Sequence, residues 1–106
     1  MKMQHYLDFI GTDGSGYWSN ERKLVKCVGY EISNITDDFG ELRVYFDPTT
    51  WNVEEDGLIY TDNNFIAGIR EAFGTNDIHY SEQGMQGDDY VSFDVNGEFL
   101  NMYEGA

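Results

Sequence analysis

Residues 77–99 read DIHYSEQGMQGDDYVSFDVNGEF, and this stretch decides the fold of the chain. In its segment 90–95, YVSFDV, an aliphatic or phenyl side chain returns at every second position, which is the period of a half-buried strand. A glycine-rich turn precedes this strand, and Asn96-Gly97, the dipeptide that best fits a type I′ hairpin turn, follows it. The stretch therefore predicts an antiparallel meander with strands at 77–82, 89–95 and 98–103.

The rest of the chain predicts further strands and a single helix. Strand patterns occur at 3–10, 22–32, 41–47 and 58–60. Apolar residues at helical spacing predict a helix over 62–73, capped by Thr61 or Asp62 at its start and by Gly74 at its end. The expected fold is α+β in a single domain, 1–106. It is a twisted antiparallel sheet of five to six strands, with the one helix (about 62–73) packed on one face.

The composition bounds the class of protein. The 106 residues are 41% hydrophobic, so the chain folds, although 20 acidic residues against 6 basic ones give a net charge of −14. This charge argues against direct contact with nucleic acid or with an anionic membrane, because each phosphate must be met by Lys or Arg. No apolar run has the length of a membrane span, and a single cysteine suits a reducing compartment, so we expect a cytoplasmic protein. The predicted partner is a basic protein, either a toxin domain or a nucleic-acid-binding enzyme.

Acidic residues dominate the second half of the chain. After Arg70 there are eight carboxylates and no Lys or Arg. We expect the sheet face opposite the helix to be polar and acidic, and to bind the partner. Earlier in the chain, Trp51 precedes three acids and is either an aromatic anchor for a partner or a lid on the core. The predicted partner-binding residues are Glu82, Asp88, Asp89, Tyr90, Asp94 and Glu98, together with Trp51, Glu54, Glu55 and Asp56.

Catalytic chemistry finds little support in the sequence. A thiolate pair of Cys27 with His5 or His79 is conceivable, but a lone cysteine in an apolar strand is usually a packing residue. Asp88-Asp89 lies in an exposed turn, without the contrasting environments that a catalytic acid/base pair needs. The acids around His79 match no strong metal-binding pattern. We therefore expect no enzyme, no cofactor and no metal.

One segment resembles a known family. Residues 89–94, DYVSFD, follow a helix with an aromatic end and a strand that begins Asp-Ile. In this they resemble the C-terminal part of the small acidic immunity proteins that neutralise cloacin-type ribonuclease bacteriocins. The resemblance implies an antiparallel sheet whose acidic face binds a basic toxin domain, with Asp89, Asp94 and the neighbouring acids in contact with it.

Two other functions remain open beside an immunity protein. The first is a phage-borne DNA mimic, which would inhibit a restriction or CRISPR enzyme by placing carboxylates where phosphates bind. The second is a structural or regulatory domain whose acidity keeps it soluble. All three are non-enzymatic, and the first two share the same electrostatic attraction to a basic surface.

Overall fold

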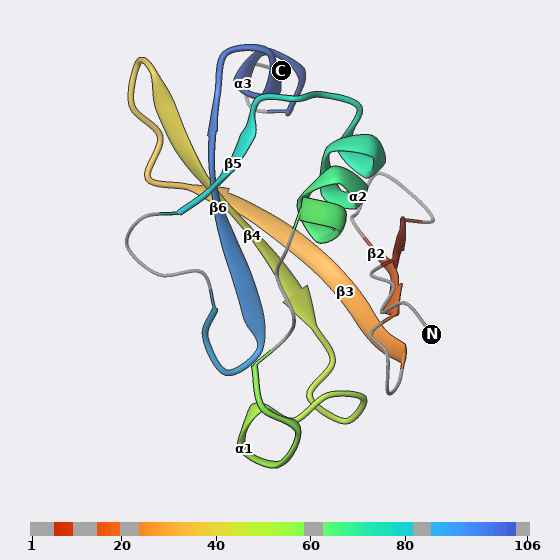
Figure 1. Cartoon of the computed structure of the whole chain (residues 1–106). Coiled ribbons are helices and arrows are strands. Elements are labelled where there is room, and N and C mark those ends of the chain that lie inside the picture. The colour runs from red at the N-terminus through yellow and green to blue at the C-terminus, as the bar shows by residue number, and fades with distance from the viewer. Residues whose placement is uncertain (1–5, 10–14, 20–23, 59–62, 82–85, 104–106) are drawn as a thin grey trace.

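The computed structural model describes residues 6–9, 15–19, 24–58, 63–81 and 86–103. These residues form one antiparallel sheet and three helices (Figure 1). In their order across the sheet, the strands are β1 (Tyr6–Phe9), β2 (Ser15–Ser19), β3 (Leu24–Ser33), β4 (Phe39–Phe46), β6 (Tyr90–Asn96) and β5 (Ile78–Tyr80). The helices are α1 (Val53–Asp56), α2 (Asn63–Phe73) and α3 (Gly97–Tyr103). The predicted α+β class and the antiparallel sheet are confirmed.

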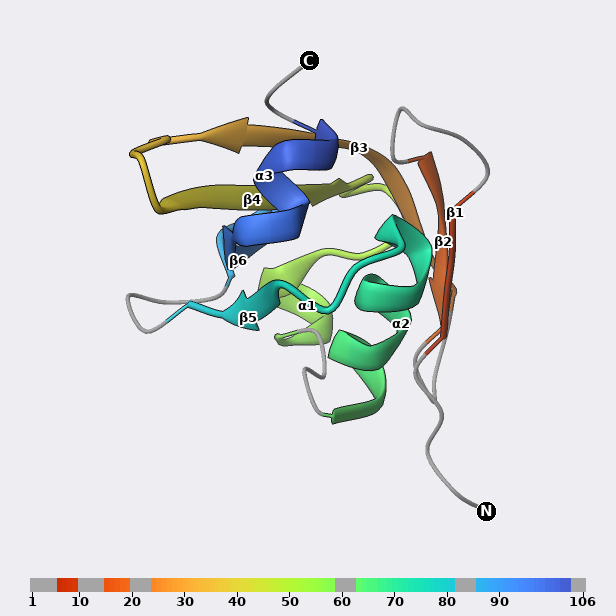
Figure 2. The same ribbon diagram turned by 90° about the horizontal axis from the view of Figure 1, so that it is seen from above.

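Helix α2 covers one face of the sheet, which we call the inner face. Figure 2 shows the sheet curling around α2, whose backbone passes close to both edge strands, β1 and β5. The ring of Phe65 in α2 lies 5.9 Å from that of Phe93 in β6, and α3 joins the same core through Phe99, 5.6 Å from Phe73. The expected core side chains are buried as predicted: Phe65, Ile66, Ile69 and Phe73 of the helix, Leu42, Val44 and Phe46 of β4, and Val91, Phe93 and Val95 of β6.

Strand β3 changes the phase of its buried side chains partway along. Val25 and Cys27 are buried, whereas beyond a bulge the positions that pack against the core are Tyr30 and Ile32. A bulge places one extra residue on one strand of a pair and so shifts the alternation by one. As a result, Glu31 lies on the face opposite the helix.

The predicted hairpin turn and the predicted strand 98–103 are wrong, because this segment forms α3. The carboxylate of Asp77 accepts a hydrogen bond from the N–H of Glu98 at 2.8 Å and caps the first turn of the helix. Gly97 has a φ of 42°, and a Cβ at this position would lie 2.7 Å from Asp77 Oδ2. The glycine that suggested a hairpin therefore permits close approach of the capping carboxylate.

Several predicted features lie outside the described residues. These are most of the strand 58–60, the cap at Thr61 or Asp62, and the carboxylate of Glu82. The predicted end of α2 is confirmed, since Gly74 has a φ of 78°. None of the helices within the described ranges has the length and apolar character needed to traverse a bilayer.

Candidate protein-interaction surface

The sheet face opposite α2, which we call the outer face, carries polar and aromatic side chains in register. The pairing of β4 with β6 sets Tyr45 opposite Tyr90, Arg43 opposite Ser92 and Glu41 opposite Asp94. Side chains that are directly opposite in an antiparallel pair share a face, so these six residues form three successive layers. The outer face is polar and carries the acids Glu41 and Asp94, as expected, and Arg43 in the middle layer makes it mixed in charge.

Two groups of predicted acids meet at one end of the sheet, which we call the acidic end. Phe46, the last residue of β4, donates its N–H to the carbonyl of Asp89 at 2.9 Å, so the turn before β6 lies beside the segment that leads to α1. Figure 1 shows α1 and the start of β6 at the same end of the molecule. The acidic end comprises the exposed Glu54, Glu55, Asp88 and Asp89 and the half-buried Asp56.

Short-range hydrogen bonds fix the α1 part of the acidic end. The side chain of Asn52 accepts from the N–H of Glu54 at 2.9 Å, and the carboxylate of Asp56 accepts from the N–H of Asn52 at 2.9 Å. Gly57, with a φ of 82°, ends the helix. Acids in a first helical turn also interact favourably with the helix dipole. Glu54 and Glu55 are thus held on an ordered turn and face solvent, while Asp56 closes the turn.

Two tyrosines adjoin the acidic end on the outer face. The rings of Tyr45 and Tyr90 are 5.9 Å apart and inclined at 56°, and both side chains are half-buried. The Arg43 guanidinium carbon lies 4.5 Å from the centre of the Tyr90 ring, a cation–π contact. The Tyr45 hydroxyl donates to Glu31 at 2.9 Å, and this hydrogen bond raises the pKa of Tyr45. These contacts give the tyrosine pair a defined geometry.

The turn before β6 is shaped to accommodate Tyr90. Gly87 donates its N–H to the Tyr90 carbonyl at 2.9 Å, and a Cβ on Gly87 would collide with the Tyr90 ring. A glycine here allows the ring to lie against the backbone of the turn. Any larger residue at this position would have to displace the Tyr90 ring.

Arg43 offsets part of the negative charge of the adjoining layer, through an ion pair with Glu41. Its Nε lies 2.5 Å from Glu41 Oε2, and Asn34 donates to the other Glu41 oxygen at 2.8 Å. The hydrogen bond from Arg43 is the largest cause of a lowered pKa for Glu41, with smaller contributions from Asn34 and Ser92. Directly opposite like charges destabilise a strand pair, so the guanidinium offsets repulsion between Glu41 and Asp94.

Trp51 lies in the core and not on the interaction surface. Its side chain is 2% exposed, and the indole N–H donates to the Gly57 carbonyl at 2.9 Å. The interpretation of Trp51 as a core lid is therefore the correct one, and its assignment as a partner-binding residue is wrong. The acidic end instead presents Leu58, which is 68% exposed directly after α1. Tyr45 was missed by sequence reasoning, since only the β4–β6 register brings it beside Tyr90.

Two other predicted binding residues are separated from the acidic end. Asp94 is half-buried in the third layer from that end, with His79 of β5 paired on its other side. Glu98 is exposed on α3, at the end of the molecule opposite α1 (Figure 1). Of the predicted set, the structure thus places Glu54, Glu55, Asp56, Asp88, Asp89 and Tyr90 at the same end of the molecule.

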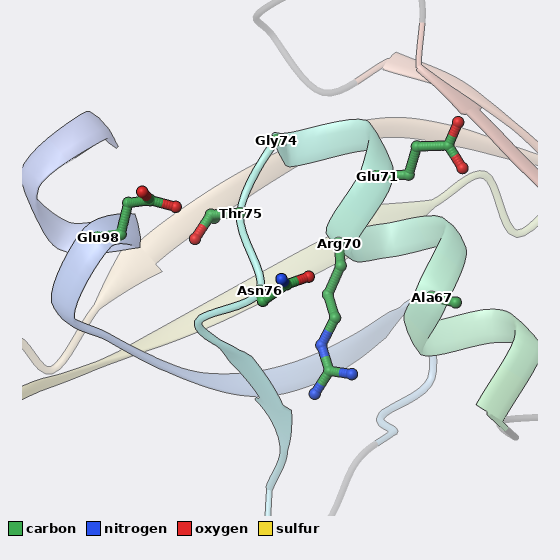
Figure 3. Close-up of a pocket in the computed structure, with 7 residues that line it drawn as sticks. All are labelled: Ala67, Arg70, Glu71, Gly74, Thr75, Asn76 and Glu98. Atoms are coloured by element: carbon green, nitrogen blue, oxygen red, sulfur yellow. The ribbon is translucent and has the colours of Figure 1, made fainter.

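A groove of about 520 Å³ opens between the end of α2 and the start of α3. Its lining is Ala67, Arg70, Glu71, Gly74, Thr75, Asn76 and Glu98 (Figure 3). Figure 3 shows the Arg70 side chain pointing away from Glu71 and Glu98, and its Nε donates to the Ile78 carbonyl at 2.9 Å. Arg70 therefore ties α2 to edge strand β5. The charged side chains of the groove point in different directions and do not converge on a common ligand position. The outer face is therefore the stronger candidate for an interaction site.

Cys27 has the properties of a packing residue. It is 5% exposed on the inner face, and burial raises its pKa to about 12, so the thiol is protonated at neutral pH. His79 lies on the outer face, where it cannot reach this thiol, and His5 lies outside the described residues. Within the described parts of the chain, no group of three or more His, Cys, Asp or Glu side chains is placed to hold a metal ion.

Comparisons of the chain with family models, with curated proteins and with solved structures found no match. The resemblance to immunity proteins stays a prediction, carried by the residues of the β5–β6 region. The acidic end and the tyrosine pair beside it are the features of the described residues that bear on function.

Proposed function

We propose that this protein is a non-enzymatic acidic inhibitor that binds and occludes a basic protein, and that it acts as an immunity protein against a toxin. The observation that carries the proposal is the juxtaposition of the acidic end with Tyr45 and Tyr90. Tyr45 and Tyr90 lie on strands whose inner face is packed against α2, which holds the tyrosine pair in a defined position. The resemblance of residues 89–94 to the immunity proteins supports the same function.

The two parts of the surface contribute differently to binding. Carboxylates on the acidic end attract a basic partner over a distance set by the ionic strength, which raises the association rate. Tyrosines supply rigid apolar area with a polar tip, and they are enriched among the residues that dominate binding energy. The exposed Leu58 adds an apolar contact at the acidic end.

A compact basic surface fits this arrangement better than a nucleic-acid channel does. A DNA mimic needs a continuous row of negative charge, since duplex DNA carries one charge per about 1.7 Å of its axis. On the outer face, the tyrosine layer and Arg43 separate the acidic end from Glu41 and Asp94. Along β4 and β6 the row of carboxylates is therefore interrupted, and Glu31, beside this gap on β3, accepts a hydrogen bond from the Tyr45 hydroxyl.

The proposal is tested with a panel of cloacin-type ribonuclease domains. Each domain is assayed for cleavage of a fluorescent RNA at low and at high ionic strength, with increasing amounts of this protein. We expect inhibition of at least one domain, through a complex whose association slows as salt is added. Association is measured in parallel by surface plasmon resonance.

A pair of charge-reversed variants serves as variant and matched control. Asp88→Lys with Asp89→Lys reverses two adjacent exposed acids at the acidic end, and Asp37→Lys with Asp38→Lys makes the same change in the exposed β3–β4 turn. The first variant should associate more slowly by about tenfold or more at low salt, and the second should change association far less. Equal effects of the two variants, or no association with any domain of the panel, would contradict the proposal.

A further inference from the structure

The outer face carries its charges in a fixed order along the strands. From the acidic end the order is carboxylates at Asp88 and Asp89, the tyrosine pair, the guanidinium of Arg43 with Glu31 of β3 opposite it, and carboxylates again at Glu41 and Asp94. Residues two apart on a strand are separated by about 6.7 Å, so the layers on the strands repeat at roughly this spacing. The order is asymmetric from one end of the face to the other.

From this order we infer that the outer face selects a basic partner that carries a complementary row of groups. Along that row the partner has a basic, an apolar, an acidic and a second basic group, at the spacing of the layers. The inference rests on the proposed function and adds the partner's charge pattern and docking direction. A partner turned end for end would place its apolar group against Arg43 and its acidic group against the tyrosine pair. Arg43 and the partner's acid would then both lack an opposite charge, and unpaired charges of this kind help interfaces reject wrong registers.

Arg43 is positioned to fix the register in which the partner docks on the outer face. It is the only lysine or arginine in β4, β5 and β6, three strands that the structure describes in full. Glu41 holds its Nε at 2.5 Å and the Tyr90 ring supports the guanidinium from 4.5 Å, yet 33% of the side chain remains exposed. A guanidinium fixed in this way loses little freedom when a partner carboxylate binds it.

The test uses an extended peptide that reproduces the complementary order. In acetyl-Lys-Lys-Thr-Leu-Thr-Asp-Thr-Lys-Lys-amide, a lysine, the leucine, the aspartate and a second lysine face one side at the two-residue spacing of a strand. The control peptide exchanges the aspartate and the threonine that follows it, which turns the carboxylate to the opposite side in either chain direction and keeps composition and net charge. Both are titrated into the protein at low ionic strength, and dissociation constants are read from amide chemical shifts in NMR spectra.

We expect the ordered peptide to bind the wild-type protein about threefold more tightly than the exchanged peptide, the scale of one exposed ion pair. Arg43→Gln should abolish this preference. Arg43→Lys should retain part of it, and Lys26→Gln, which removes the same charge from an exposed position on β3, should leave it intact.

Two different failures are distinguishable. If both peptides bind the acidic end equally well, the docking order is refuted while the proposed binding of basic partners stands. If neither peptide shifts the amides of the acidic end or the outer face, the outer face is not a basic-ligand surface, and both the inference and the proposed function fail. A preference that persists in Arg43→Gln would also refute the role of Arg43.

Discussion

Replacing Phe93 with alanine should remove a large part of the stability of the fold. The Phe93 side chain is fully buried at 0% exposure, and its ring is 5.9 Å from those of both Phe65 and Tyr80. Truncation of a buried phenylalanine costs about 3–5 kcal/mol, which includes the lost burial and the cavity left behind. Because contacts come from α2 on one side and β5 on the other, we expect a cost in the upper half of that range. A domain of this size has a free energy of unfolding of about 5–15 kcal/mol, so the variant would be marginal.

The measurement is urea denaturation followed by far-ultraviolet circular dichroism. Phe39→Ala is the matched control, since Phe39 lies on neighbouring β4 but is 58% exposed. Its substitution should change the free energy of unfolding by no more than about 0.5 kcal/mol. Similar costs for the two variants would mean that β6 does not present Phe93 to the core, and the strand register would be refuted.

Three further predictions concern α3 and pH. Asp77→Ala should lower the free energy of unfolding by about 1 kcal/mol in urea denaturation, because the cap on Glu98 N–H is lost, whereas Asp77→Asn keeps an acceptor and should cost less. Gly97→Ala should cost more than about 1 kcal/mol, since its φ of 42° is unfavourable and its Cβ would crowd Asp77, and an equal or higher stability would contradict this backbone geometry. Hydrogen bonds lower the pKa of Glu41 and of Asp47 in the folded protein, so the unfolded chain binds more protons as the pH falls below about 4.5. The two ionised carboxylates should therefore contribute fully to the free energy of unfolding above that pH, and this contribution should be lost as the pH falls below it. Thermal melts between pH 3 and pH 6 should show a weaker pH dependence of the melting temperature for Glu41→Gln than for the wild-type protein.

The sequence by itself determined the elements whose signals are local. Alternation in YVSFDV and in residues 41–47 predicted β6 and β4, because the two-residue period depends only on which side chains follow one another. Helical spacing and Gly74 predicted α2 and its end for the same reason. The excess of carboxylates and their gathering after Arg70 are also properties of the sequence alone.

Only the tertiary structure decided the features that depend on residues far apart in the chain. The carboxylate that caps α3 belongs to Asp77, 21 residues before Glu98, so no local signal marked the start of this helix. Asn96-Gly97 therefore suggested a hairpin turn. In the structure, the helix buries both of the adjacent apolar residues Phe99 and Leu100. The strand register likewise brought Tyr45 beside Tyr90, and it placed Arg43 between two acidic regions. Local periodicity assigns a side chain to a face, but it does not say which residue of another strand lies opposite, and that pairing creates the surface proposed to bind a partner.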